Sequence, residues 1–346
     1  MAQPADVLDR FGLGAVTAVE PVDSGLMHGT WFVTAAAGAF VLQRLHPKLA
    51  TAEIAADYAA VTAHLAARGL RAPRLVPDAT GAPVTAGADG TWWRLTTRVP
   101  GHTRARVTSP GEAEQGARAL GRFHRAMADL PHTFASQHPL HDTAAHLAGL
   151  RAAAARPDLQ GFQAEIADAI AFLLQVLPGL LLAEDLPRRV VHGDPKISNV
   201  MFEGEVAVGL IDLDTCNRHS VLVDLGDAVR SWCRDGAEDE TESFHLDRFE
   251  AVLRGYAAEG LALTAAEVAG LAGAGRLITL ELAARFARDA LEDEYFGYDA
   301  RRYPDRRSHN RARTRAMLHL AADMQRQAEA MAAAVARHFP TPGSTL

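Results

Sequence analysis

The stretch that decides the fold is VVHGDPKISN, residues 190–199, which is followed by LIDLD at residues 210–214. The first stretch places an Asp, a Lys two positions later and an Asn five positions later in one short loop. The second ends an apolar, strand-like run with two carboxylates. Transfer of a phosphoryl group from a nucleotide requires a carboxylate beside the acceptor hydroxyl, a cation for the moving group and oxygen ligands for magnesium. The two stretches together supply each of these groups.

The residue types assign the roles. Asp194 is the expected catalytic base, or at least orients the acceptor hydroxyl, and Lys196 is expected to neutralise the transferring phosphate. Asn199 and Asp212 are the expected magnesium ligands, because this ion prefers hard oxygens and few protein contacts. The five-position step from Asp194 to Asn199 is that of the kinase catalytic loop. For Asp214 three roles stay open: sharing the metal, contacting the substrate, or a purely structural one.

Each half of this pattern has a simpler explanation when it is taken alone. A Gly-Asp pair often marks a turn, and an acidic run can be the end of a strand that meets water. Either half is therefore a weak motif by itself. Their order along the chain, and the strand-like flanks at residues 189–191 and 206–211, favour the catalytic interpretation.

Four polar residues near the motif are expected to be structural. His192 is expected to brace the loop by hydrogen bonding and not to transfer protons. Asp224 is expected to hold the acidic loop in place. Asp227 and Arg230 lie three positions apart in a helical pattern, the spacing at which two side chains can pair.

Composition excludes several classes of protein. Of the 346 residues 48% are hydrophobic and 22% charged, which is typical of a globular chain and not of a disordered one. The formal net charge of -7 argues against general nucleic-acid binding. Two cysteines, Cys216 and Cys233, are too few for a disulfide framework, which favours a reducing compartment. The most apolar stretch, residues 169–183, is too short to span a bilayer. We expect a soluble cytoplasmic protein without a membrane or nucleic-acid partner, and the oligomeric state stays open.

Secondary-structure patterns divide the chain in two. Short apolar runs between Gly-bearing turns predict a small antiparallel sheet with one helix, and Pro100-Gly101 then predicts a hinge. Ala-rich helical patterns follow. The predicted fold is α+β and bilobal, with a nucleotide-binding lobe at residues 1–100 and a helical lobe, carrying the catalytic loop and the acceptor pocket, at residues 101–340. The expected strands are residues 16–22, 30–34, 39–45, around Leu75 and 91–99, and the expected helices are residues 51–68, 111–129, 143–156, 162–177, 222–232, 243–259, 264–292 and 310–338.

Two places in the first lobe are expected to meet the nucleotide. The turn between the first two strands contains Ser24, Gly25 and Gly29, and glycine lets backbone N–H groups approach a phosphate closely. The third strand should carry a cation for the phosphates, paired with an acid on the next helix. Alignment places Gln43 there with Arg44 beside it, and neighbouring positions on a strand face opposite sides. Either Arg44 reaches the cleft through a local twist, or Gln43 acts as a neutral amide. The expected acid is Glu53 or Asp57.

Four segments carry a resemblance to a known family: residues 41–45, residues 192–199 with 212–215, residues 224–230, and the run from Arg285 to Arg313. They resemble the aminoglycoside phosphotransferase and choline kinase superfamily, most closely its N-acetylhexosamine 1-kinase-like branch. The resemblance implies a protein-kinase-like fold, ATP and Mg²⁺ as cofactors, and phosphorylation of the anomeric hydroxyl of N-acetylglucosamine or N-acetylgalactosamine. It also places Arg285 and Asn310 near the sugar.

One residue of the motif departs from that branch. The branch commonly has Asn where this chain has Gly193, just before the expected base. An amide supplies two donors and one acceptor, so its loss is expected to alter the sugar preference.

Two other functions stay open on the sequence. An aminoglycoside or other small-alcohol kinase would use the same fold, and the acidic run at residues 238–242 could then meet a polycationic acceptor. A nucleotide-binding pseudokinase is suggested by the amide of Gln43 where a cation is expected. The intact Asp194, Asn199 and Asp212 argue against the pseudokinase.

Overall fold

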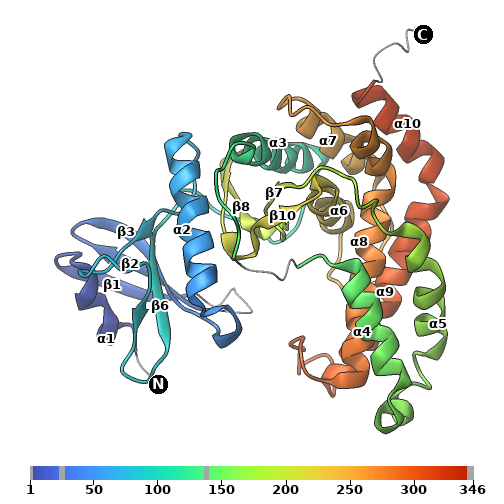
Figure 1. Ribbon diagram of the computed structural model, residues 1–346, viewed down its shortest axis with the longest axis horizontal. Helices are drawn as coiled ribbons and strands as arrows, with labels where there is room; N and C mark the ends of the chain where they lie inside the picture. Colours follow the sequence, from blue (N-terminus) through green and yellow to red (C-terminus); the bar gives the residue numbers. More distant parts are fainter. Residues whose placement is uncertain (1–2, 23–27, 136–139, 341–346) are drawn as a thin grey trace.

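The computed structural model describes residues 3–22, 28–135 and 140–340, and these form two lobes (Figure 1). An antiparallel sheet with one long helix makes up the N-terminal lobe, and the second lobe is mainly helical. The predicted α+β bilobal fold is therefore confirmed. The last strand of the sheet ends at Thr97 and the first helix of the second lobe begins at Pro110, so the division at residue 100 falls within the connecting segment.

The sheet of the N-terminal lobe has strand order β1-β2-β3-β6-β4, with β5 paired to β6. Its helix α2 (Ala52–Ala67) begins after Thr51, whose side chain accepts a hydrogen bond from the N–H of Ile54 and so caps the helix. One face of the sheet forms a small core of its own, with Leu42 and Trp93 fully buried. The strands are β1 (Val16–Pro21), β2 (Gly29–Ala35), β3 (Gly38–Arg44), β4 (Leu75–Val76), β5 (Thr85–Ala86) and β6 (Trp92–Thr97).

The second lobe is built around one long buried helix, α8 (Ala265–Glu292), which packs against α4, α6 and α9. A capping box starts α8: Thr264 accepts from the N–H of Glu267, and the Glu267 carboxylate accepts from the N–H of Thr264. The other helices are α3 (Pro110–Met127), α4 (Thr143–Ala155), α5 (Ala167–Val176), α6 (Val221–Trp232), α7 (Leu246–Ala257), α9 (Arg306–Arg326) and α10 (Ala328–His338).

Two short antiparallel pairs of strands frame the catalytic segment. Strand β7 (Arg189–Val191) pairs with β10 (Asn217–His219), and β8 (Val200–Glu203) pairs with β9 (Val206–Leu210). The β7–β10 pair lies beside α3 and α6 and the β8–β9 pair beside α3, on the side of the helical lobe that faces α2 (Figure 1). The segment at residues 192–199 therefore connects β7 to β8, at the junction of the two lobes.

The single helix expected at residues 310–338 is wrong. Helix α9 begins earlier, because Asp305 accepts a hydrogen bond of 2.6 Å from the N–H of Ser308 and caps the helix four residues before the expected start. It ends at Gln327, whose backbone leaves the helical conformation and whose side chain donates to the carbonyl of Phe244 at 3.2 Å. The helix expected at residues 162–177 likewise begins only at Ala167, after a 3-10 turn.

Within the described residues, no helix is both long enough and apolar enough to cross a lipid bilayer. The two cysteines, Cys216 and Cys233, are buried and free. Burial raises the pKa of both thiols, so neither is a reactive thiolate at neutral pH.

Candidate active site

The two sequence stretches meet through His192. Its Nδ1 accepts a hydrogen bond of 3.3 Å from the N–H of Asp194, and its Nε2 lies 2.9 Å from the carbonyl oxygen of Ile211. Nε2 must therefore carry the proton and donate it, which identifies the tautomer. A backbone hydrogen bond of 2.9 Å from the N–H of Ile211 to the carbonyl of Asn199 adds a second link. The predicted bracing role of His192 is confirmed.

A buried carboxylate on α6 binds the backbone of the catalytic loop, residues 192–199. Asp224 accepts hydrogen bonds from the N–H groups of His192 (2.6 Å) and Gly193 (2.8 Å) and lies 2.9 Å from Nε2 of His124. Burial works to raise the pKa of Asp224, but the bond to His124 and the N–H of His192 lower it below the usual value. The expected holding role of Asp224 is confirmed, and it falls on the catalytic loop itself.

Gly193 has a backbone that excludes side chains. Its φ is +87°, in the region that favours glycine, and an added Cβ would lie 2.5 Å from the carbonyl oxygen of Thr215. The glycine in this motif therefore has a structural reason, the close approach of two backbone segments.

Asp194, Lys196 and Asn199 form one cluster. The Lys196 Nζ lies 2.6 Å from Oδ2 of Asp194, and the amide nitrogen of Asn199 donates to the Asp194 carbonyl oxygen at 2.9 Å. Burial works to raise the pKa of Asp194, but the Lys196 ammonium more than offsets this and lowers it. The Asp194 carboxylate is therefore ionised at neutral pH. No described residue donates to Oδ1 of Asn199, the amide oxygen that could bind a metal.

Asp212 lies where β9 turns into the next segment, with a left-handed backbone (φ 63°, ψ 59°) that is rare for a residue with a side chain. The side chain is open to the cleft, but surrounding protein and the neighbouring Asp214 raise its pKa above the usual value. In the described part of the chain it has no hydrogen-bond partner. A carboxylate in this state favours binding of a cation, and with Asn199 it offers the hard oxygens that suit Mg²⁺.

The register of the sheet distinguishes Gln43 from Arg44. Gln43 is directly opposite Arg94 of β6, and its side-chain oxygen accepts from that guanidinium at 2.7 Å. Arg44 is opposite Trp93 and approaches the Trp31 ring, at 6.0 Å from its centre, on the other face. Gln43 therefore faces the cleft, and the local twist that would bring Arg44 there is not observed.

Helix α2 was expected to supply an acid, Glu53 or Asp57, that pairs with the third-strand residue, and neither acid bonds to Gln43 among the described residues. Asp57 is buried and bonds instead to Nε2 of His132 (2.7 Å) and the N–H of Ala135 (3.1 Å). Glu53 is exposed and has no hydrogen bond or ion pair within the described residues. The expectation of Glu53 or Asp57 is therefore wrong, because α2 presents Tyr58 to the cleft cation Arg94.

The expected phosphate turn falls largely outside the described residues, which omit Ser24 and Gly25. Gly29 begins β2, where an added Cβ would meet the Trp31 ring at 2.9 Å. His28 just before it lies near the acidic loop, with Nε2 3.5 Å from Oδ2 of Asp214.

A narrow pocket opens beside the expected base, and His141 lines it together with Gly193. His141 Nδ1 lies 2.8 Å from Oε1 of Glu281, whose other oxygen accepts from Thr143 at 2.5 Å. Burial and the His141 charge act in opposite directions on Glu281, and its pKa falls to about 2. Nε2 of His141 is buried and has no hydrogen-bond partner among the described residues. The other lining residues are Leu140, Val191, Thr215, Asn217, His219 and Val223.

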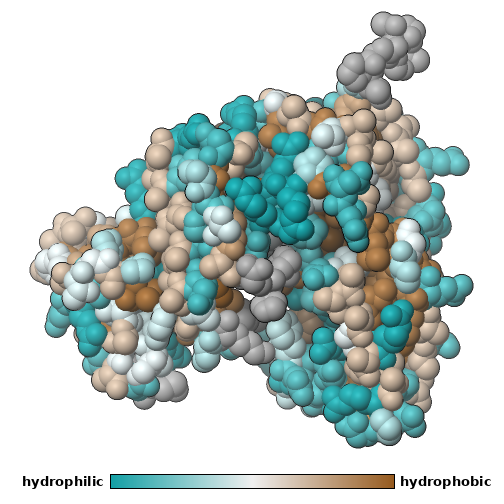
Figure 2. Space-filling model, viewed as in Figure 1, coloured by the Kyte–Doolittle hydropathy of each residue, from teal (hydrophilic) through white to brown (hydrophobic). Residues whose placement is uncertain are grey.

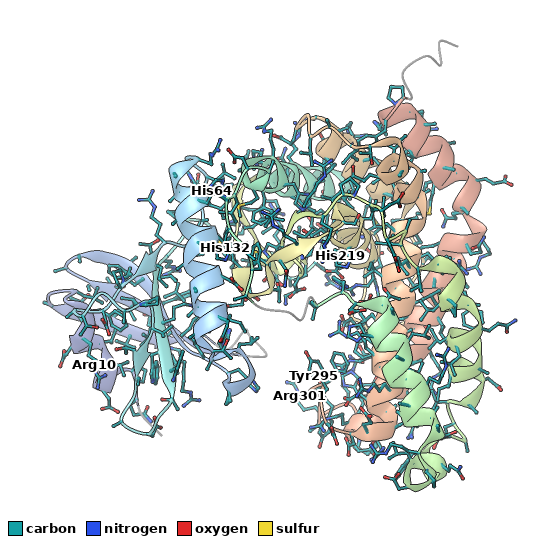
Figure 3. All side chains as sticks on the ribbon, in the orientation of Figure 1. Arg10, His64, His132, His219, Tyr295 and Arg301 are labelled. Carbon is teal, nitrogen blue, oxygen red and sulfur yellow. The ribbon has the colours of Figure 1, made fainter. Side chains whose placement is uncertain are left out.

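The loop after α8 borders the same side of the molecule. Figure 2 shows a hollow between the N-terminal lobe and the part of the helical lobe around α4, and Figure 3 shows Tyr295 and Arg301 at its edge. Arg285 of α8 lies over the Tyr295 and Phe296 rings, 6.0 and 5.6 Å from their centres. Asn310 is fully buried and donates to Asp289 at 2.8 Å. Because Asn310 is buried and bonded to Asp289 of α8, it supports the start of this loop and does not line the hollow.

Asp227 and Arg230 form the predicted pair at 2.7 Å, buried within α6. Glu238 extends this pair, 3.3 Å from the Arg230 guanidinium, and Asp239 accepts from the Tyr303 hydroxyl at 2.7 Å. The acidic run at residues 238–242 is thus engaged in internal pairs at these two positions.

Similarity to known proteins identifies the family of this chain. The chain belongs to the phosphotransferase enzyme family, whose family model matches residues 18–261. It is therefore a phosphotransferase that acts on an alcohol group, and the predicted superfamily is confirmed.

Relatives that are similar to this chain include homoserine kinases. One from Methylobacterium radiotolerans is 28% identical over 278 residues, covering 77% of this chain and 79% of the relative. Another from Rhizobium meliloti is 27% identical, with 72% of each chain covered. They support a small-molecule kinase, and the N-acetylhexosamine branch stays a prediction.

Solved structures agree in fold. An amicoumacin kinase in complex with AMP-PNP, Ca²⁺ and Ami has a TM-score of 0.61 at 17% identity, covering 99% of this chain and 96% of the other. A microcompartment-associated aminopropanol kinase has a TM-score of 0.59 at 16% identity, with 94% and 97% covered.

Proposed function

We propose that this chain is an ATP- and Mg²⁺-dependent kinase of a small polar acceptor, acting in the cytoplasm. The observation that carries the proposal is the cluster of Asp194, Lys196 and Asn199, joined to Asp212 through the His192 bridge. These groups match the requirements of phosphoryl transfer in kind and in order.

The proposed mechanism gives each side chain one task. Asp194, ionised because Lys196 lowers its pKa, accepts a hydrogen bond from the acceptor hydroxyl, orients it and takes its proton. Lys196, which is partly exposed, offers its ammonium to the transferring phosphoryl oxygens. Asn199 and Asp212 would hold Mg²⁺, which neutralises phosphate charge when bound. We propose that Ser24, Gly25 and Gly29 line the phosphates and that Gln43, and not Arg44, faces the nucleotide.

We further propose an N-acetylhexosamine, phosphorylated at its anomeric hydroxyl, as the acceptor. The segments at residues 224–230 and 285–313 resemble the kinases of such sugars. The pocket beside Gly193 contains Nε2 of His141, which has no hydrogen-bond partner among the described residues and could bond to a polar group of the substrate. Arg285 and the aromatic rings near it are proposed to form the outer wall. Homoserine is the second candidate, because relatives similar to this chain include homoserine kinases.

A product assay separates the two acceptors. The chain would be incubated with Mg-ATP and each of N-acetylglucosamine, N-acetylgalactosamine, a neutral hexose, homoserine and an aminoglycoside, with EDTA as the control. Phosphorus NMR would identify the ester, and mild acid would then be added. A sugar 1-phosphate is an acid-labile acetal, whereas a phosphorylated alkyl alcohol survives. We expect an acid-labile product from an N-acetylhexosamine. An acid-stable ester from homoserine would overturn the sugar assignment, and tight nucleotide binding without any ester would overturn the kinase.

A further inference from the structure

A buried arginine from the N-terminal lobe reaches the acidic loop of the other lobe. Arg94 of β6 contacts Asp214 with two parallel hydrogen bonds, Nη1 to Oδ1 at 2.5 Å and Nη2 to Oδ2 at 2.7 Å. It also donates to the side-chain oxygen of Gln43 from Nε (3.2 Å) and Nη2 (2.7 Å). Its guanidinium lies 3.8 Å from the centre of the Tyr58 ring on α2. Both charged side chains are almost fully buried, at 2% and 3% exposure.

Arg94 has little left with which to bind a phosphate directly. A guanidinium carries five N–H donors, and these contacts use four of them. The Tyr58 ring covers one of its faces. Burial works to lower the pKa of Arg94, but Asp214 raises it, and the same pairing lowers the pKa of Asp214. The pair is therefore ionised throughout the physiological pH range.

Asp214 is two residues from Asp212, the proposed magnesium ligand. Asp214 is the middle residue of a 3-10 turn, Leu213–Thr215, which begins directly after the left-handed backbone of Asp212. Leu213 is buried and anchors the turn from the other side. We therefore expect a displacement of Asp214 to move the Asp212 carboxylate as well.

We propose that Arg94 is a positioning residue that supplies, from strand β6, the ion pair that kinase-like folds build with a cation on the third strand, without contacting the phosphates itself. In those folds a strand lysine pairs with an acid on the next helix. Here Gln43 takes the lysine's place on the strand and accepts from Arg94, and Asp214 takes the place of the helix acid. The pair joins the nucleotide lobe to the metal loop and holds Asp212 in place for the ion. This inference rests on the proposed function.

The test removes both charges together, because removing one partner of a buried pair leaves an uncompensated charge and can unfold the protein. The variant is Arg94→Gln with Asp214→Asn. Its matched control is Arg68→Gln with Asp129→Asn, which removes an exposed ion pair that also joins α2 to the helical lobe. Two quantities are measured: kcat with the best acceptor, and the gain in affinity for a non-hydrolysable ATP analogue when Mg²⁺ is added. Thermal unfolding of each variant reports whether it is folded.

We expect kcat of the cleft variant to fall by about 100-fold, the cost of a small misplacement at the reacting centre. The Mg²⁺-dependent gain in affinity should be lost, while affinity without metal should stay near that of the unmodified chain. The control should match the unmodified chain in both. A folded cleft variant with normal kcat and a normal Mg²⁺ effect would overturn the proposal. If the cleft variant does not fold, Arg94→Lys replaces it, because a lysine keeps the charge but not the parallel pair of bonds. Arg94→Lys should show the same loss, and a normal Mg²⁺ effect would overturn the proposal.

The binding measurement needs no acceptor. If the unmodified chain phosphorylates none of the acceptors, the proposed function fails, whereas the comparison of Mg²⁺-dependent nucleotide binding still tests Arg94.

Discussion

Position 193 requires glycine for two reasons, a positive φ and a backbone segment too close for a Cβ. A second glycine, Gly204, has only the first of them. Gly193 combines a φ of +87° with a backbone atom 2.5 Å from the place of a Cβ, whereas Gly204 has a φ of +57° and nothing within 4 Å. Backbone strain acts at both positions. The clash with Thr215 acts only at Gly193, so the two positions form a matched pair.

We therefore predict that Gly193→Ala displaces the catalytic loop and that Gly204→Ala does not. Each substitution should lower the free energy of unfolding by about 1 kcal/mol through strain. Gly193→Ala should cost more than this and lower kcat by about 10- to 100-fold, because Asp194 moves with the loop. Urea unfolding and steady-state kinetics measure both effects. Equal kcat values for the two variants would contradict the role given to the close approach.

The raised pKa of Asp212 predicts a link between pH and magnesium. A proton and the metal compete for this carboxylate, so protonation weakens metal binding as the pH falls towards the raised pKa. Asp194 has a lowered pKa and stays ionised over the same range. The Mg²⁺ concentration for half-maximal rate should therefore rise as the pH falls from 7 towards 5, and excess Mg²⁺ should restore the rate. Free Mg²⁺ must be held known, since ATP also binds protons. A half-saturating concentration that does not change with pH would contradict this.

Helix α6 holds the catalytic loop through Asp224, which bonds to the backbone of that loop and to His124 of α3. Tyr256 bonds the far nitrogen of His124 at 2.8 Å. Asp224→Asn places an amide NH₂ among N–H donors, and we predict a loss of about 3 to 5 kcal/mol in the free energy of unfolding at pH 7. Tyr256→Phe removes a single hydrogen bond and should cost about 1 kcal/mol. Urea unfolding of both variants checks the order, and equal losses would contradict it.

The pH dependence of this effect has a definite sign. The folded pKa of Asp224 lies below its usual value, so the stabilisation is complete above the unfolded pKa. It is lost as the pH falls through the folded pKa. The difference between the unmodified chain and Asp224→Asn should therefore shrink in acid.

Local signals predicted most elements of the fold. The strands of the first lobe followed short apolar runs between Gly-bearing turns. The helix expected at residues 264–292 matches α8, whose capping box of Thr264 and Glu267 needs only neighbouring residues. The continuous helix expected at residues 310–338 failed, because its break at Gln327 depends on a contact with Phe244 that lies 83 positions away. Helical periodicity cannot report such a contact.

The same limit applies to the site. Asp194, Lys196, Asn199 and Asp212 could be proposed from the sequence because they lie within one short stretch of chain. Arg94 was missed, since its partner Asp214 is 120 positions away. His141 and Glu281 were missed as a pair for the same reason, at a separation of 140. A pairing signal for Arg94 existed only in the strand register, which aligns it with Gln43.

At the scale of the molecule, the two lobes are joined by more than the hinge. The Arg94–Asp214 pair closes the cleft from within, Asp57 of α2 bonds to His132 in the connection after α3, and Arg68 pairs with Asp129 at the surface. Figure 1 shows α2 running along this junction. The acidic loop is thus positioned by both lobes, and the central claim is that it performs phosphoryl transfer with Asp194 as the base.

That claim is tested most directly by Asp194→Asn, which keeps the size of the side chain and removes its charge. The measurement is transfer of the labelled γ-phosphoryl group of ATP to the best acceptor in a single turnover, with the nucleotide dissociation constant determined on the same sample. Loss of a general base predicts a rate lower by about 10²- to 10⁴-fold, with the dissociation constant nearly unchanged. Transfer at the rate of the unmodified chain would contradict the account.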